Sequence, residues 1–412
     1  MIMASAFNEN LEYRTDNWYL CPTDFLPEIR EQYHFAKQIK VTDCTLRDGE
    51  QQAGVVFTKD DKIEIAKALD RLGVHEIEVG TPASSEADKQ AAYEIAHMGM
   101  KKAKATALAR ALKQDIDLVS DLGVWGANIS YPIGDLQRKY KLKVEDDAYI
   151  DHCLEITAYA RSKGLHVNFS PYDTTRCNIP FLLKVMQKLH DSGNVDRIRL
   201  VDTVGSATPQ AMTYYVKTLK SVLKEIPLEV HVHNDFGMAM ANSMAALCAG
   251  AEVVSTTMNG VGERSGNTPT EEVVLTLQLL YGIDLGVDCS VLKETSELVQ
   301  RLSGVKLARN KAVVGQNCFA HESGLAVAGM KNMPYTSEAY NPALVGQARR
   351  IVLGKKSGKS SIEQVLTRMG FEGFTPEDIA ALLAQVKDVS IANKRAVEED
   401  EFAAMAKARL EK

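Results

Sequence analysis

The sequence predicts an α/β protein, a (β/α)₈ TIM barrel followed by a small helical C-terminal module. Short β-rich runs recur about every thirty residues, and helical patterns lie between them. Eight strands alternating with helices over about 250 residues are typical of a parallel barrel. A doubly wound open sheet is the alternative, but such sheets usually have fewer strands, and the turn after the first strand lacks a GxGxxG phosphate loop. The eight predicted strands are residues 39–44, 75–80, 104–109, 126–131, 166–170, 197–202, 228–233 and 252–257.

The segment TKDDKIEIAKALDRLG, residues 58–73, shows the pattern expected of the helices between the strands. Thr58 is placed to cap the helix, with Asp61 three residues further on. Apolar residues fall on one face of the segment, and Gly73 is expected to end it. The first strand is therefore followed by a helix, as a βα unit requires.

After about residue 285 the alternation of strands and helices stops. SVLKETSELVQRLSG predicts one helix, and the last 38 residues, from Thr375 to Lys412, predict two amphipathic helices. A loop-rich, basic stretch before them could contact an anionic ligand. We expect three parts: an N-terminal extension (1–37), the catalytic barrel (38–285) and a helical post-barrel module (286–412).

Composition excludes several classes of protein. The 412 residues are 45% hydrophobic and 25% charged, a balance typical of globular proteins, and the net charge of −6 comes without a basic block that would suit nucleic acid. A run of about 18 apolar residues, which a membrane helix needs, does not occur. The N-terminus does not resemble a secretory signal. The seven cysteines are scattered without a CxxC motif, which indicates a reduced, cytoplasmic protein. We expect its partners to be small-molecule substrates.

Polar residues gather where the predicted strands end. In a parallel barrel the active site lies at the carboxyl ends of the strands. These residues are Arg47 and Asp48 after the first strand, Glu78 late in the second, Tyr172, Asp173 and Arg176 after the fifth, Thr203 after the sixth, His231 and His233 at the end of the seventh, and Asn267 after the eighth.

Three of these residues suggest a metal site. His231 and His233 are two positions apart on a strand, so both imidazoles point to the same side. Asp48 offers a carboxylate across the barrel, and Asn267 could add a carbonyl oxygen. Two imidazoles and a carboxylate can bind a divalent metal. The alternatives are two histidines with ordinary hydrogen bonds, or the same ligand set in a non-haem iron oxygenase, which usually has a double-sheet β fold.

Arg47 and Asp48 are adjacent in sequence, so their side chains cannot form a relaxed bidentate ion pair with each other. We expect Asp48 to turn toward the metal and Arg47 toward the substrate, where a cation can stabilise a developing enolate oxygen. A surface Arg–Asp pair after a strand is the alternative.

These residues resemble the metal-dependent barrel family of isopropylmalate synthase, homocitrate synthase, citramalate synthase and 3-hydroxy-3-methylglutaryl-CoA lyase. The resemblance covers residues 39–365, and NPALVGQARRIVLGKKSGKSSI is similar to a post-barrel segment of the synthases that the lyase lacks. The motifs that carry it, in the family's order, are DCTLRDGEQ, IEVGTPASS, ALARALKQDID, FSPYDTTR, VDTVGSATP, HVHNDFGMAMANS and NGVGERSGN.

The resemblance implies a role for each matched residue. In the synthases one divalent ion (Mg, Mn or Zn) holds a 2-oxo acid, and an acyl-CoA such as acetyl-CoA loses an α-proton, attacks the keto carbon and is hydrolysed to free CoA. The lyase runs the carbon–carbon step in reverse. The implied metal ligands are Asp48, His231, His233 and Asn267, and the implied roles of Arg47 and Glu78 are catalytic. Tyr172 and His321 complete the predicted catalytic residues, and the predicted substrate-binding residues are Gln51, Arg110, Thr203 and Tyr335.

Two positions depart from the synthase pattern. Tyr172 stands where the synthases have a glutamate, and Ala326 stands where they have a catalytic histidine. His321, five residues upstream, and Tyr172 are the remaining candidates for the acid–base group. Tyr335 resembles a synthase tyrosine that enters the neighbouring subunit's site, about two residues out of register, and a homodimer is expected on the same ground.

Three hypotheses follow. The post-barrel segment favours condensation of an acyl-CoA with a 2-oxo acid. Tyr172 and Ala326 favour the lyase. A barrel kept only for binding is disfavoured because Arg47, Asp48 and both histidines are retained. A leucine-sensing regulatory domain is not expected, because the sequence ends soon after the helical module.

Overall fold

The structure is a computed structural model that describes residues 12–411. The chain divides into two compact units. The first is Thr23–Leu307, and the second combines Glu12–Pro22 with the segment from Ala308 onward. The predicted N-terminal extension is thus shared between the units, and its first 11 positions lie outside the described residues. The domain boundaries at residues 37 and 285 stay predictions.

The first unit is a closed barrel of eight parallel strands that follow one another in chain order. It closes where Lys40 on the first strand pairs with Val253 on the last. The predicted (β/α)₈ barrel is confirmed. The strands are β1 (Lys40–Asp43), β2 (Glu76–Glu78), β3 (Lys104–Arg110), β4 (Gly126–Ser130), β5 (His166–Ser170), β6 (Arg197–Asp202), β7 (Leu228–Val232) and β8 (Val253–Thr256).

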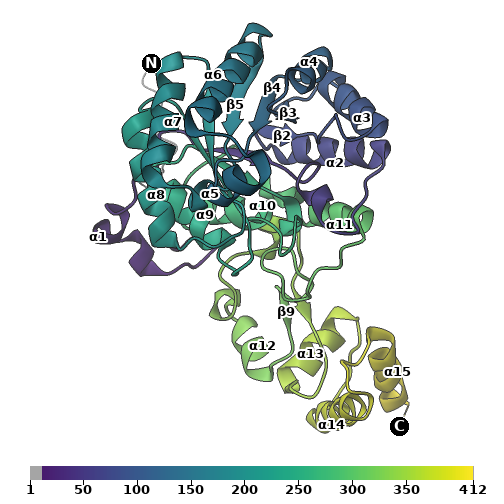
Figure 1. Ribbon diagram of the computed structural model, residues 1–412. Helices are drawn as coiled ribbons and strands as arrows, with labels where there is room; N and C mark the ends of the chain where they lie inside the picture. The colour runs from purple at the N-terminus through teal and green to yellow at the C-terminus, as the bar shows by residue number, and fades with distance from the viewer. Residues whose placement is uncertain (1–11, 412) are drawn as a thin grey trace. The chain divides into compact units, whose positions relative to one another are not determined.

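Helices lie around the outside of the strands (Figure 1). The helix after β1 begins as predicted: Thr58 and Asp61 form a capping box, and Gly73 ends the helix with a φ of 95°, a conformation that glycine adopts without strain. No described helix is both long and apolar enough to span a membrane. The helices of this unit are α1 (Pro27–Arg30), α2 (Lys59–Leu72), α3 (Glu86–His97), α4 (Lys113–Asp121), α5 (Asp135–Gln137), α6 (Asp146–Ser162), α7 (Ile179–Ser192), α8 (Pro209–Leu223), α9 (Ala239–Cys248), α10 (Thr270–Leu279) and α11 (Leu292–Ser303).

Buried charges of alternating sign cross the barrel interior. Arg197 and Arg199 of β6 extend to acids on other strands: Arg197 Nη1 lies 2.8 Å from Glu76 Oε1, and Arg199 Nη1 lies 3.1 Å from Glu78 Oε2. Glu229 of β7 lies 2.9 Å from Arg197 Nε and 2.8 Å from Arg199 Nη2. All five side chains are buried. Because isolated buried charges are strongly disfavoured, each group is held in place by its neighbours of opposite charge.

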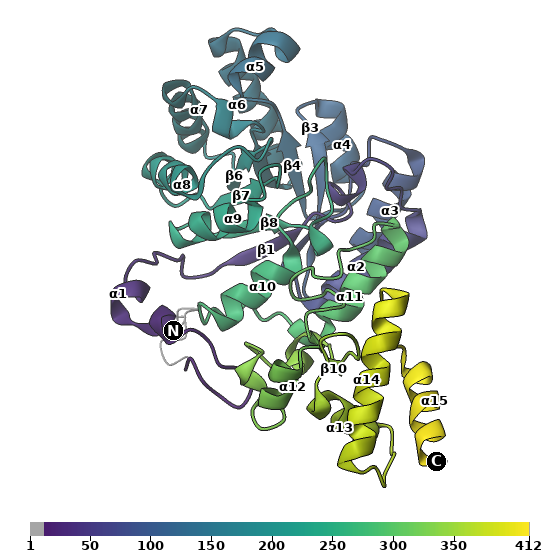
Figure 2. The ribbon, with the colours of Figure 1, turned by 90° about the horizontal axis from the view of Figure 1, so that it is seen from below.

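The second unit is mainly helical, as the sequence predicts. Two short parallel strands, β9 (Ala320–His321) and β10 (Arg350–Ile351), accompany α12 (Gly324–Met330), α13 (Lys359–Arg368), α14 (Pro376–Asn393) and α15 (Glu399–Leu410). Helices α14 and α15 lie side by side (Figure 2) and share an apolar core that includes Phe402. Trp18 from the N-terminal segment pairs with Tyr340 in this unit.

Candidate metal centre and active site

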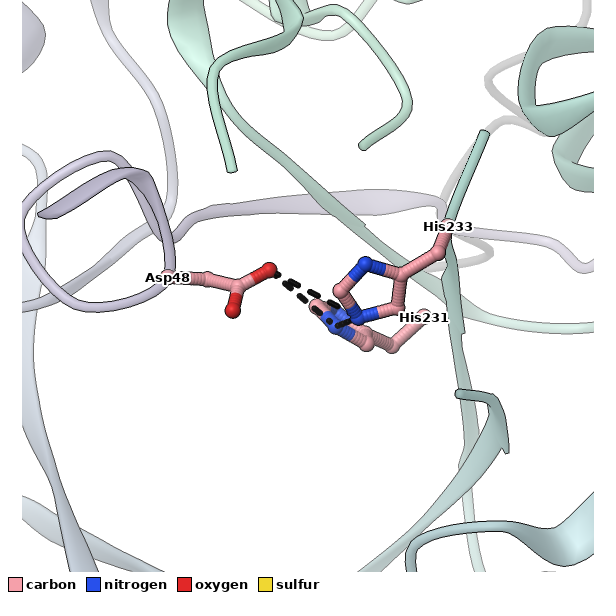
Figure 3. Close-up of side chains that lie close together, drawn as sticks. All are labelled: Asp48, His231 and His233. Atoms are coloured by element: carbon pink, nitrogen blue, oxygen red, sulfur yellow. Dashed lines mark hydrogen bonds and ion pairs between the residues drawn. The ribbon is translucent and has the colours of Figure 1, made fainter. Parts of the chain in front are cut away.

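Asp48, His231 and His233 meet at the carboxyl ends of the strands. Asp48 lies in the turn after β1, His231 lies in β7, and His233 directly follows β7. The two imidazoles lie on one side of the strand, as their spacing predicts, and the Asp48 carboxylate points at both (Figure 3). The Nε2 atoms of the two histidines are 3.3 Å apart. Asp48 Oδ2 lies 3.6 Å from His231 Nε2 and 3.7 Å from His233 Nε2.

The chemistry of this cluster fits a metal ion. One ligand atom from each residue lies within 4.8 Å of the others, and all three side chains are buried. Burial lowers the pKa of His231 and of His233, which leaves neutral imidazoles with lone pairs. Burial alone would raise the pKa of Asp48, but the charge of Arg47, the two histidines and a hydrogen bond from Asn267 outweigh it and lower that pKa. The cluster therefore offers a carboxylate charge and two imidazole lone pairs to a cation.

Asn267 supports this reading. Its Nδ2 donates to Asp48 Oδ2, while its own Oδ1 is buried and accepts no hydrogen bond from any described residue. Asp48 Oδ1 is likewise buried without a hydrogen bond from the described residues, although it lies 3.1 Å from Arg47 Nη1. Buried oxygens of this kind are usually satisfied. A cation in the cluster would satisfy them.

Arg47 is held by a partner that sequence reasoning missed. Its Nε donates to Glu78 Oε1 at 2.9 Å, its Nη2 lies 3.4 Å from Glu78 Oε2, and its Nη1 donates to Gln51 Oε1 at 3.1 Å. Only Nη1 approaches Asp48, so the two neighbours do not form a bidentate pair, as predicted. Gln51 therefore orients Arg47, and Glu78 anchors it.

Glu78 is fully buried between two guanidinium groups. Burial alone would raise its pKa, but the charges of Arg199 and Arg47 lower it to about 2. A signal for this arrangement exists in the sequence. The segment EIE in β2 and the segment RIR in β6 place like charges two apart on buried strands, which indicates complementary charges on one inward face.

The remaining predicted residues of the first unit lie at strand ends but have other partners. Thr203 Oγ1 accepts from the Asp173 amide at 2.7 Å. Arg110 is more than half exposed and forms two hydrogen bonds with Asp115, of 2.7 and 2.8 Å. Its guanidinium is thus committed to a neighbour on the barrel rim, and its substrate-binding role stays a prediction.

Tyr172 has a cationic partner that sequence reasoning missed. Its hydroxyl accepts from Lys141 Nζ at 2.7 Å, and this lysine also lies 5.2 Å from the centre of the tyrosine ring. Lys141 belongs to a single π-helical turn, Arg138–Leu142, after β4. Such turns often occur at functional sites. The signal in the sequence is the basic run RKYKLK.

His321 and Tyr335 belong to the second unit. His321 Nε2 lies 3.0 Å from Glu338 Oε1, and Arg349 Nε donates to the same oxygen at 2.8 Å. Tyr335 Oη donates to the carbonyl of Asp16 at 2.5 Å. The buried acid Glu338 therefore orients His321, and sequence reasoning missed it.

Fold and site together define a class: a (β/α)₈ barrel protein with a candidate metal centre at the carboxyl ends of its strands. Residues 38–299 match the HMGL-like family model, and residues 313–394 match the model described as homocitrate synthase post-HMGL domain-like. The chain belongs to the HMGL-like family.

Curated relatives cover most of this chain. It is 40% identical over 353 residues to "Homocitrate synthase AksA" of Methanothermobacter thermautotrophicus, which covers 86% of this chain and 89% of that one. It is 40% identical over 391 residues to "2-isopropylmalate synthase" of Methanocaldococcus jannaschii, with 94% of this chain and 74% of that one covered. A solved hydroxymethylglutaryl-CoA lyase from Pseudomonas aeruginosa aligns with a TM-score of 0.58 at 22% identity, over 66% of this chain and 95% of that one, and shows the shared fold.

Proposed function

We propose that this protein is a divalent-metal-dependent acyltransferase that joins an acyl-CoA, in the first instance acetyl-CoA, to a 2-oxo acid by a Claisen-type condensation. The observation that carries the proposal is the buried cluster of Asp48, His231 and His233 with the Arg47 guanidinium beside it. The relatives named homocitrate synthase and 2-isopropylmalate synthase support the condensing direction.

The condensation of acetyl-CoA with a 2-oxo acid conserves every atom and proton. A proton leaves the methyl carbon next to the thioester, that carbon bonds to the keto carbon, and the keto oxygen gains a proton to become a hydroxyl. Water then cleaves the thioester, which releases the CoA thiol and a carboxylate. A bound divalent cation would supply Lewis-acid polarisation of the keto group and a template for the 2-oxo acid.

Residues of this chain would bind the cation and place a second positive charge beside it. Asp48, His231 and His233 would hold the cation. Glu78 and Gln51 fix the Arg47 guanidinium beside Asp48, so its charge would stabilise an enolate oxygen formed next to the cation without reorganisation. Tyr172 or His321 would move the α-proton.

The lyase is the second candidate function, and Tyr172 and Ala326 in place of the synthase acid–base residues favour it. The likeness to solved lyases is below 25% identity and extends to the fold alone. The post-barrel match at residues 313–394 favours the synthase.

Thiol release distinguishes the two. Purified protein is mixed with acetyl-CoA, Mg²⁺, Mn²⁺ or Zn²⁺ and a panel of 2-oxo acids, and free CoA is followed with a thiol reagent. We expect release that depends on both a metal ion and one 2-oxo acid. Release without a 2-oxo acid would be simple thioester hydrolysis, and no release with any member of the panel would contradict the condensation.

Arg47→Lys is expected to lower kcat by about 10²-fold, the scale of one lost oxyanion donor, without changing metal content. Lysine keeps the charge but loses the planar fork that bonds Glu78 and Gln51. Steady-state kinetics and metal analysis check this. Arg301→Lys is the matched control, because Arg301 is an exposed residue that pairs with Glu64. A kcat within twofold of wild type would remove Arg47 from the mechanism.

We further propose that the protein acts as a cytoplasmic homodimer. None of the seven cysteines, all of which lie in the described part of the chain, forms a disulfide, which is consistent with a reducing compartment. Light scattering of the purified protein tests the dimer, since a monomeric mass would contradict it.

A further inference from the structure

A chain of buried hydrogen bonds leads from His231 to Glu78. His231 Nδ1 lies 2.8 Å from Ser255 Oγ on β8, and Ser255 Oγ lies 3.0 Å from Cys44 Sγ, directly after β1. Cys44 Sγ lies 2.9 Å from Glu78 Oε2. Ser255, Cys44 and Glu78 are fully buried, so water does not compete for these bonds.

The charge on Glu78 determines the direction of every bond in this chain. Glu78 lies between the guanidinium groups of Arg47 and Arg199, so it is ionised and only accepts. Its neighbour Cys44 must therefore donate its S–H to Glu78. Burial and the Glu78 charge also raise the pKa of the Cys44 thiol well above its ordinary value, so the sulfur retains this proton.

Ser255 lies between Cys44 and His231 and contacts both. The single proton of Cys44 is used, so the contact with Ser255 requires the serine O–H to donate to the sulfur. Ser255 Oγ is then the acceptor for His231 Nδ1–H. If Ser255 donated to His231 instead, Ser255 Oγ and Cys44 Sγ would face each other at 3.0 Å with no proton between them. A second reversal, with Cys44 donating to Ser255, would point a sulfur lone pair at the Glu78 carboxylate.

We propose that Ser255 and Cys44 are positioning residues that hold His231 in the tautomer protonated on Nδ1, so that its Nε2 lone pair faces Asp48 and His233. The inference rests on the proposed metal site and deepens it. Partners of this kind, hydrogen-bonded to the far nitrogen of a metal-binding histidine, fix its tautomer and orientation. Here Glu78 serves both groups: it anchors Arg47 directly and orients His231 through two intermediates.

The first test reads the tautomer without any metal. The apoprotein is labelled with ¹⁵N-histidine, and long-range ¹H–¹⁵N spectra report which nitrogen of His231 carries the proton; the His231 signals are assigned by their loss in His231→Gln. We expect protonated Nδ1 in the wild type and in Cys44→Ser, which keeps both a donor and an acceptor. Ser255→Ala is expected to shift His231 toward the Nε2-protonated form or a mixture of the two. A wild-type spectrum with the proton on Nε2 would overturn the inference.

The second test measures metal affinity, with Mn²⁺ as the probe and its free-ion EPR signal as the readout. Ser255→Ala is expected to raise the Mn²⁺ Kd by about 10- to 100-fold, the usual effect of losing such a partner. Cys44→Ala is expected to weaken binding in the same direction, and Cys44→Ser to restore it. Circular dichroism and Tm of the apoproteins show whether a variant is misfolded. The Cys44→Ser and Cys44→Ala variants differ by one oxygen atom, so a difference in Kd between them reports the hydrogen bonds at this position.

The outcomes separate this inference from the proposed function. Wild-type affinity and tautomer in both Ser255→Ala and Cys44→Ala would overturn the inference even if acyl transfer were established. The predicted tautomer and affinity changes in a protein that transfers no acyl group to any 2-oxo acid would support the inference and contradict the proposed function.

Discussion

His233→Ala is expected to abolish stoichiometric metal binding and acyl transfer while the barrel stays folded. His233 supplies one of the three converging ligand atoms. Without it, only Asp48 and His231 of this cluster remain, which are too few ligands to hold an ion stably. The fold should persist because the substitution removes only a side chain at the end of β7 and keeps the His233 amide, which donates to the Asp202 carbonyl at 3.2 Å. Metal analysis of the purified protein and circular dichroism measure the two effects.

His166→Ala is the matched control for this prediction. Burial lowers the pKa of His166, to about 4, as it lowers that of His233, but His166 lies at the start of β5 and stacks on Trp125. It should retain the metal. Asp48→Ala should behave like His233→Ala. Full metal content in both of these variants would show that the cluster does not hold the ion.

Removing the residue that accepts the α-proton is expected to slow proton exchange of acetyl-CoA in D₂O by about 10²- to 10⁴-fold, the usual contribution of a general base. The exchange is followed by NMR with a bound 2-oxo acid. His321→Ala is the first variant, because Glu338 and Arg349 hold this imidazole in a defined orientation. Tyr172→Phe is the second, because the substitution removes only the oxygen that Lys141 contacts.

Tyr140→Phe is the matched control for the tyrosine. Tyr140 lies in the same π-helical turn as Lys141 and its side chain is 66% exposed, so its hydroxyl should not matter. Exchange at the wild-type rate in both His321→Ala and Tyr172→Phe would remove both residues as bases. Absence of exchange and of thiol release in the wild type would leave the lyase as the better-supported function.

Sequence patterns predicted the features of this protein that depend on residues close together in the chain. The spacing of β-rich runs predicted all eight strands in order, and Thr58, Asp61 and Gly73 predicted the limits of α2. The two-residue period of a strand predicted that His231 and His233 point to one side. Each of these features depends on neighbours in the chain, so a short segment contains the whole signal.

Only the tertiary structure decided which side chains meet across the barrel. Glu78 of β2 meets Arg199 of β6, and Ser255 of β8 connects Cys44 to His231, over separations of 121, 211 and 24 residues. Arg110 pairs with Asp115, and Tyr172 pairs with Lys141. The physical reason is that contacts of this kind depend on how the strands stagger when the barrel closes and on the rotamer each buried charge takes to reach a partner. Neither the strand stagger nor the rotamer is set by any short stretch of sequence. The sequence alone therefore predicted the fold and the candidate metal ligands, and the closed barrel determined the network of contacts around those residues.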